Sequence, residues 1–246
     1  MTTLGRGSSL AGRLSRAGVA DVARAERLLA DERLVALVPD AATLLVGPLA
    51  DVADPDQALL ALATLAGAVT GDDALSALFA EVLHDEGARR DRLLRVVGAS
   101  AALGAQLAAH PSGLRSVLDQ TRATGVDARQ VRAELLVAVG ADPQAEVPVA
   151  SLAGPAGVDA MRRAYRDRLL RVAADDLSAP DPLTRMPAVA AALADLAAAA
   201  LEAGLALARA DLPDAGAGVR LAVIGMGKGG GRELNYVSDV DVVYVA

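Results

Sequence analysis

The sequence contains no cysteine and no tryptophan, and its 246 residues include only one phenylalanine and three tyrosines. The lack of cysteine excludes disulfide bonds, thiolate zinc sites and a cysteine nucleophile. The shortage of aromatic residues means that any core must be built mainly from Ala, Leu and Val. Such a core depends on many small contacts between helices that approach one another closely.

A surplus of positive charge is also missing. The chain has 24 basic and 31 acidic residues, which gives a net charge of −7. Nonspecific binding to a nucleic-acid backbone needs Lys and Arg in excess, so we expect no nucleic-acid partner. The hydrophobic content of 53% argues for a folded chain rather than a disordered one.

Targeting and membrane signals are weak. Arg6, Arg13 and Arg16 occur without an acidic residue in the first twenty positions, but an ordinary polar tail explains them better than a transit peptide. No apolar signal-peptide segment follows. The most apolar stretch, Leu193–Ala210, is interrupted by charged residues, whereas a spanning helix needs about 20 apolar residues. We therefore expect a cytoplasmic protein without a membrane partner.

The pattern of apolar residues predicts a mainly α chain that ends in the truncated start of an α/β domain. Helical spacing runs through residues 1–212, and β-branched runs follow it. The predicted parts are a helical, bundle-like region at 1–140, a Pro- and Gly-rich linker at 141–157, two helices within 158–212, a hinge at Leu212–Gly218 and the first strands of the α/β domain at 219–246. Two strands alone leave unpaired edges, so this last domain is expected to be incomplete.

A glycine cluster follows the first predicted strand, Leu221–Ile224. Gly225–Gly230 matches the G-x-G-x-x-G pattern of dinucleotide-binding folds, but only Gly231–Val237 separates it from the next strand. That segment is too short for a packed crossover helix. A P-loop is also excluded, because Gly229 follows Lys228 where Ser or Thr is required.

Two carboxylates open the second predicted strand. Asp239 and Asp241 precede the apolar run Val242–Val245, and a short piece compatible with a helix, Arg232–Tyr236, lies before them. Side chains two residues apart on a strand point to the same face. Paired carboxylates beside a glycine turn suit a hard divalent cation that carries nucleotide phosphates. A solvated strand start is the alternative interpretation of the pair alone.

The order of small-residue turn, short helix and Asp-hydrophobic-Asp strand resembles the nucleotidyltransferase fold of the polymerase-β superfamily. The segment GMGKGGGRELNYVSDVDVVYV closely resembles the signature of the bifunctional glutamine synthetase adenylyltransferase/deadenylylase family. Leu93–Ser100 with His110-Pro111, and the Arg-rich Met161–Leu177, resemble further segments of that family. Gly229 stands where the family often has a larger residue, and Val237 replaces a frequent Gly.

The resemblance implies a regulator of glutamine synthetase. Members of the family remove AMP from a tyrosine of glutamine synthetase by phosphorolysis in an N-terminal half, and add it from ATP in a C-terminal half. This chain resembles the N-terminal, deadenylylating half. The implied cofactor is Mg²⁺, with ATP, ADP and phosphate as substrates. The implied partners are glutamine synthetase and a PII-type nitrogen-signalling protein.

The resemblance also assigns roles to residues. Asp239 and Asp241 would be the catalytic metal ligands, with a third acid from a later strand. The backbone of Gly225, Gly227, Gly229 and Gly230 would approach phosphate. Ser238 would bond a phosphate oxygen or cap the turn, and Lys228 would pair with phosphate or remain solvated.

Other charged residues favour structural interpretations. Arg232 and Glu233 fit a first helical turn or a local ion pair. The arginines between Arg162 and Arg171 fit an exposed helix face, with an anion- or partner-facing surface as the sharper alternative.

Two functions remain open from the sequence. The first is an enzyme fragment that is expected to be inactive alone, because the third acid is missing. The second is a non-catalytic helical module that binds a partner protein.

Overall fold

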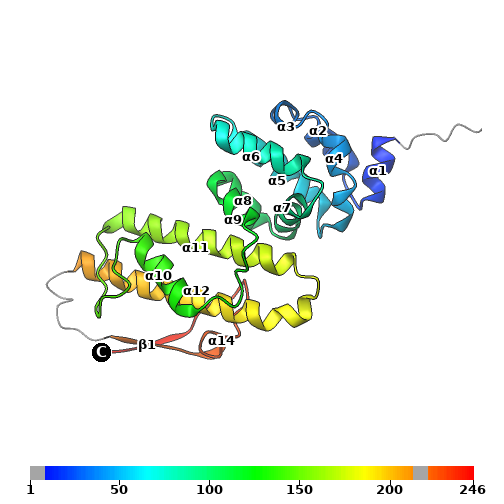
Figure 1. The fold of residues 1–246 in the computed structure, drawn as a ribbon. Helices are drawn as coiled ribbons and strands as arrows, with labels where there is room; N and C mark the ends of the chain where they lie inside the picture. Colours follow the sequence, from blue (N-terminus) through cyan, green and yellow to red (C-terminus); the bar gives the residue numbers. More distant parts are fainter. Residues whose placement is uncertain (1–8, 213–220) are drawn as a thin grey trace, which may run out of the picture. The chain divides into compact units, whose positions relative to one another are not determined.

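The computed structural model describes residues 9–212 and 221–246. The predicted hinge therefore lies outside the described residues, apart from Leu212. The chain divides into two compact units, Met1–Asp119 and Gln120–Ala246. Figure 1 shows both, and each is described by itself below. The described chain is mainly helical, as the sequence predicted, with two short strands near its C-terminus.

The first unit is entirely helical among its described residues. Its elements are α1 (Leu10–Arg16), α2 (Val22–Leu29), α3 (Glu32–Leu37), α4 (Ala41–Leu45), η1 (Pro48–Asp51), α5 (Pro55–Val69), α6 (Asp73–His84), α7 (Ala88–Ala99), α8 (Ala101–Ala109), η2 (Pro111–Gly113) and α9 (Leu114–Leu118). Helix α5 is central and packs against α2, α3, α7 and α8. Asp54 and Asp72 accept backbone N–H bonds at the starts of α5 and α6, so local capping helps to fix where these helices begin.

Close helix approach replaces aromatic bulk in this unit. Phe79 and Leu62 are fully buried, and the remaining core is mostly Leu, Val and Ala. Gly98 of α7 lies so near Val52 and the start of α5 that a Cβ atom there would collide with the Val52 side chain. The absence of a side chain at Gly98 therefore permits the contact between α5 and α7, as expected for a core built from small contacts.

In residues 120–212 and 221–246, the second unit consists of three longer helices and a hairpin that contains a single helical turn. Its elements are α10 (Ala128–Ala138), α11 (Gly154–Leu177), α12 (Pro182–Asp211), β1 (Ala222–Gly225), α14 (Gly227–Gly230) and β2 (Val242–Val245). Helix α12, yellow to orange in Figure 1, packs against both α10 and α11. Buried small residues on α12, such as Ala199 and Ala203, allow this close packing, and a Cβ at Gly157 of α11 would collide with Leu207.

Helix α12 contains the apolar stretch Leu193–Ala210 noted in the sequence. Among the described residues it is the one helix long and apolar enough to cross a membrane by length and composition. Leu196, Ala199 and Ala203 are nonetheless buried against residues of α10. This helix forms the core of the second unit.

The predicted linker 141–157 lies within the second unit. The Ala150 N–H donates to the Ala206 carbonyl of α12, and the Ser151 N–H donates to the Gly140 carbonyl. Ala141 and Ala150 are buried in the core that α10 and α12 share. The division between the two compact units falls after Asp119, where no cluster of Pro and Gly marks it.

An ion cluster joins α10 to α11. The Arg168 guanidinium is 3% exposed, lies 3.4 Å from the Glu134 carboxylate, and donates to the Ala123 carbonyl at 2.9 Å. Arg171 contacts the same carboxylate at 3.1 Å. The Arg-rich helix is thus not simply an exposed face. Arg162 and Arg163 are exposed, whereas Arg168 and Arg171 hold the helix to its neighbour.

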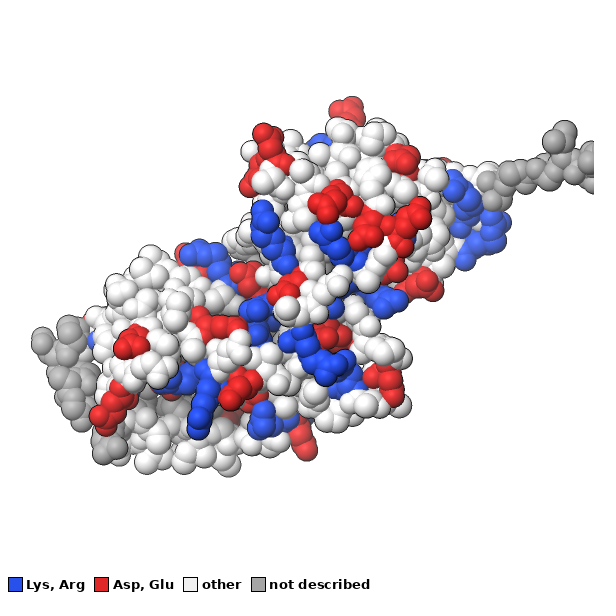
Figure 2. Space-filling model, viewed as in Figure 1, with Lys and Arg blue, Asp and Glu red and all other residues white. Residues whose placement is uncertain are grey.

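Charges of both signs are spread over the face that Figure 2 shows. In Figure 2, basic and acidic side chains alternate over the visible face rather than forming one continuous basic band.

Candidate functional site

The glycine cluster forms a turn between two antiparallel strands. β1 pairs with β2 so that Ala222 lies opposite Val245 and Gly225 opposite Val242. The Met226 N–H donates to the Asp241 carbonyl at 2.8 Å, which continues the pairing one step beyond Gly225. The two β-branched runs therefore form strands as predicted, with β1 one residue later in the chain than expected.

Glycine is required at two positions of this turn. Gly227 has φ of 51°, in the left-handed region that glycine adopts without a steric penalty. A Cβ at Gly230 would collide with the Gly225 carbonyl, so these two backbones can approach only because Gly230 has no side chain. Gly229 differs, because a Cβ there would make ordinary contact with Val240 at 3.5 Å. A side chain can therefore begin at Gly229 without a collision at its Cβ.

The two predicted metal ligands lie just before β2. Asp239 and Asp241 are both exposed, and β2 begins at Val242, so strand alternation does not by itself set their directions. The Asp241 carboxylate faces the glycine turn. One of its oxygens lies 3.7 Å from the point that a Cβ atom would occupy if Gly227 had a side chain. Ser238 is half-buried and Lys228 is exposed. The structure thus brings Asp241 together with the turn.

The prediction of a helical piece at Arg232–Tyr236 is wrong. The helix is instead the single turn α14, and the chain leaves it without further helical residues. The Arg232 N–H donates to the Gly229 carbonyl and the Glu233 N–H to the Lys228 carbonyl. This pair of bonds is the Schellman arrangement that ends a helix with a left-handed residue.

Arg232 is the left-handed residue, with φ of 56°. Glycine usually takes this position, and a side chain there costs about 1–2 kcal/mol. The Arg232 guanidinium reaches α12 and binds the Asp195 carboxylate through two hydrogen bonds, of 3.1 and 2.7 Å. Its ion-pair partner is therefore Asp195, 37 residues away, and not the neighbouring Glu233.

Two further side chains attach the same segment to the helices. Leu234 is buried in a cluster that includes Val172 of α11 and Leu193 of α12. The Tyr236 hydroxyl donates to the Asp176 carboxylate of α11 at 2.9 Å. Sequence reasoning missed these contacts, because Asp176 and Asp195 lie on helices far from the glycine turn in the chain.

Tyr236 provides a pH-dependent test of this attachment. Partial burial and the carboxylates of Asp176 and Asp175 raise the pKa of Tyr236. The stabilisation is complete below about pH 10, the ordinary tyrosine pKa, and is lost as the pH rises through the higher folded-state pKa. We expect Tyr236 to titrate above the ordinary tyrosine pKa, and Asp176→Asn to lower the pKa of Tyr236. The pKa of Tyr236 is measured as the difference in tyrosinate absorbance between the wild type and Tyr236→Phe during a pH titration. If this difference titrates near pH 10, the ordinary tyrosine value, the contact with Asp176 is contradicted.

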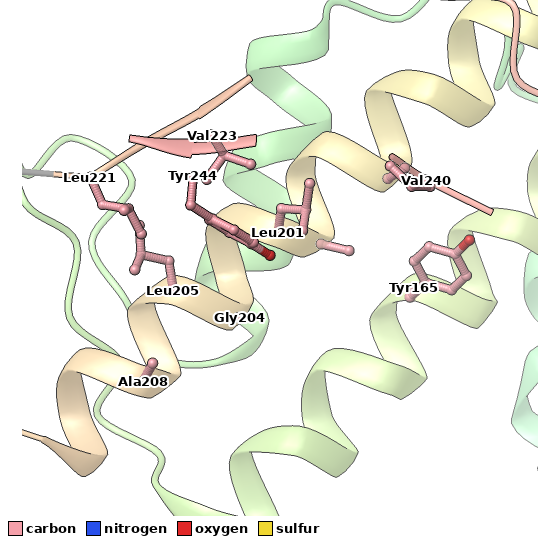
Figure 3. Close-up of a pocket in the computed structure, with 11 residues that line it drawn as sticks. Tyr165, Leu201, Gly204, Leu205, Ala208, Leu221, Val223, Val240 and Tyr244 are labelled. Atoms are coloured by element: carbon pink, nitrogen blue, oxygen red, sulfur yellow. The ribbon is translucent and has the colours of Figure 1, made fainter. Parts of the chain in front are cut away.

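A cavity of about 510 Å³ separates the hairpin from α12. Its walls are mainly apolar, with Leu201 and Leu205 of α12 on one side and Val223 and Tyr244 of the hairpin on the other (Figure 3). Neither Asp239 nor Asp241 lines it. The cavity is a gap in hydrophobic packing, and the polar residues of the candidate site lie elsewhere on the hairpin.

The carboxylates present suit part of a metal site. Within residues 9–212 and 221–246, no group of three or more His, Asp or Glu side chains is placed to hold a metal ion on its own. Asp239 and Asp241 offer hard oxygen ligands at exposed positions, and Mg²⁺ commonly uses one or two carboxylates together with waters and substrate phosphates. The residues therefore fit Mg²⁺ that is bound together with a phosphorylated substrate.

Helical units together with a glycine-turn hairpin that carries two exposed acids place this chain in the class of mainly helical proteins with a small two-stranded sheet. Comparison with known proteins identifies the family. Residues 90–246 match the family described as Glutamate-ammonia ligase adenylyltransferase, and the chain belongs to it. The family predicted from the glycine and aspartate motifs is thereby confirmed.

Individual relatives support the same family membership. The chain is similar to proteins named bifunctional glutamine synthetase adenylyltransferase/adenylyl-removing enzyme. The relative from Cutibacterium acnes is 50% identical over 68% of this chain and 16% of its own length. That from Bifidobacterium longum subsp. infantis is 39% identical over 94% and 21%. That from Streptomyces avermitilis is 42% identical over 100% and 22%. The chain thus spans about a fifth of the length of these relatives.

Proposed function

We propose that this chain forms the start of the deadenylylating half of a glutamine synthetase regulator. The observation that carries the proposal is the position of the Asp241 carboxylate beside the left-handed Gly227 of the glycine turn. Family membership supports it, since the relatives' name specifies adenylyl addition and removal on glutamine synthetase. The fold is then the first part of a nucleotidyltransferase domain of the polymerase-β superfamily, preceded by helices.

The proposed reaction is phosphorolysis of an adenylylated tyrosine. An oxygen of orthophosphate forms a bond to the phosphorus of the tyrosine-linked AMP, and the bond from that phosphorus to the phenolic oxygen breaks. The products are ADP and free tyrosine, whose phenolate takes up a proton from solvent. Reactions of this kind depend mainly on positioning and on neutralisation of phosphate charge.

Each residue of the turn has a part in this proposal. Gly225, Gly227, Gly229 and Gly230 let backbone N–H groups approach the phosphates without a side chain between them. Lys228 and Ser238 offer an ammonium and a hydroxyl to phosphate oxygens. Asp239 and Asp241 would hold Mg²⁺, which when bound would neutralise part of the phosphate charge.

The proposed partners follow from the substrate. Glutamine synthetase carries the modified tyrosine, and a PII-type signalling protein would regulate the reaction in the cytoplasm. ATP, the donor in the adenylylating direction, would act elsewhere in the full-length enzyme.

The test compares the 246-residue chain with a full-length enzyme that contains it. Each is mixed with adenylylated glutamine synthetase, Mg²⁺ and orthophosphate, and phosphate-dependent ADP formation is measured. We expect ADP from the full-length enzyme only. The chain supplies two carboxylates of the proposed site, Asp239 and Asp241, and the site needs a third acid. No phosphate-dependent ADP from the full-length enzyme would overturn the proposal. Metal-independent capture of glutamine synthetase by the chain, with no ADP from either protein, would favour a helical binding module instead.

A further inference from the structure

The segment Arg232–Tyr236 lies between the glycine turn and the two aspartates and is fastened to the helices at both ends. Arg232 binds Asp195 of α12, and Tyr236 binds Asp176 of α11. Leu234 is buried between these two polar contacts, in the core formed by the same helices. The hairpin itself packs less closely, since a cavity separates it from α12. The turn α14 also packs on α12, and this short segment adds two polar contacts and one buried side chain to that packing.

The conformation of Arg232 indicates which of these contacts is specific. Glycine would end α14 with less strain, yet an arginine holds the left-handed position. Its two hydrogen bonds meet both carboxylate oxygens of Asp195, a bidentate geometry that fixes direction as well as distance. Asp195 is 10% exposed, so the carboxylate is held within the helix packing, whereas the Arg232 side chain is 59% exposed. A fixed acceptor on a rigid helix thus anchors the end of the glycine turn.

We propose that Arg232, through Asp195, is a positioning residue that holds the glycine turn in register with Asp239 and Asp241 for adenylyl transfer. The inference rests on the proposed function for its chemistry, but the anchoring can be measured without the reaction. Arg232 does not touch substrate; it fixes the backbone from which the turn and the aspartates extend. Tyr236 and Leu234 hold the other part of the segment, so the anchoring is shared.

The first experiment measures hydrogen exchange of the turn amides in the 246-residue chain. Arg232→Gly permits the left-handed backbone and removes the side chain that binds Asp195, so the turn can still form. We expect the amides of residues 227–233 to exchange roughly three- to tenfold faster in this variant, with exchange in the first unit unchanged. Arg89→Gln is the matched control, because it removes an arginine–carboxylate pair, Arg89 with Glu81, in the first unit. Unchanged exchange at the turn in Arg232→Gly would overturn the proposal.

The second experiment measures the reaction in a full-length enzyme that contains the chain. Arg232→Gly and Asp195→Asn are expected to lower kcat roughly ten- to hundredfold, with little change in KM for adenylylated glutamine synthetase, because misplacement of the turn affects the reacting geometry. The exchanged pair Arg232→Asp with Asp195→Arg should recover activity, since aspartate tolerates the left-handed conformation. Normal kcat in both single variants, or loss that the exchanged pair does not recover, would overturn the positioning role.

The two experiments separate the two proposals. If the wild-type enzyme forms no ADP, the proposed function fails, and the exchange measurement still shows whether Arg232 anchors the turn. If the enzyme is active and the Arg232→Gly turn exchanges normally, the proposed function stands and the positioning role fails.

Discussion

Replacing both Asp239 and Asp241 with asparagine is expected to reduce phosphate-dependent ADP formation by more than about 100-fold in a full-length enzyme that contains the chain. Asparagine keeps the size of each side chain but removes the negative charge that would hold Mg²⁺ beside the phosphates. Both residues are exposed, so the stability of the chain should be nearly unchanged. The assay is ADP release from adenylylated glutamine synthetase, with thermal unfolding of each variant measured in parallel.

A matched pair of variants tests whether the effect is specific to the site. Asp73→Asn with Glu86→Gln also removes two exposed carboxylates, but from the first unit. Its activity should equal that of the wild type. If the Asp239 and Asp241 double variant is as active as the wild type, these residues do not form the metal site. If the control pair loses as much activity as that double variant, the change in net charge alone is responsible.

Local sequence patterns predicted the elements whose structure depends on local forces. The run Val242–Val245 forms β2 at the predicted residues, because β-branched side chains favour extended backbone. The turn was also predicted from its glycines. Its left-handed backbone at Gly227 and the close approach at Gly230 both need residues without a side chain. Here residue type alone restricts the backbone.

Features set by distant partners could not be predicted in the same way. Arg232–Tyr236 has a helix-compatible composition, but its conformation follows contacts with Asp195 and Asp176, which no local window contains. The stretch 141–157 has the Pro and Gly content of a linker, yet it is held against α12 by the hydrogen bond from Ala150 to Ala206. One signal of such a contact was present in the sequence. Arg232 directly follows a run of glycines, at a helix end where glycine is the usual residue.

Glu134 is expected to be the most important single charge for the stability of the second unit. Its carboxylate lies between Arg168 and Arg171 and joins α10 to α11. Arg168 is 3% exposed, so its charge receives little compensation from water. Glu134→Ala should lower the free energy of unfolding of this unit by about 2–3 kcal/mol, the range for losing a hydrogen bond to a buried charged group. Glu134→Gln keeps a hydrogen-bond acceptor without the charge, so its free energy of unfolding should lie between those of the wild type and Glu134→Ala.

The tyrosines allow this unit to be measured separately. All three, Tyr165, Tyr236 and Tyr244, lie in the second unit, so tyrosine fluorescence during urea unfolding reports on that unit, whereas far-ultraviolet circular dichroism reports on both. Glu134→Ala should move the fluorescence transition to lower urea with an unchanged slope. Glu146→Ala, at an exposed position of the same unit, should leave it in place. A fluorescence midpoint that is equal in the two variants would show that the ion cluster contributes no net stability, because the cost of burying the Arg168 charge then offsets its attraction to Glu134.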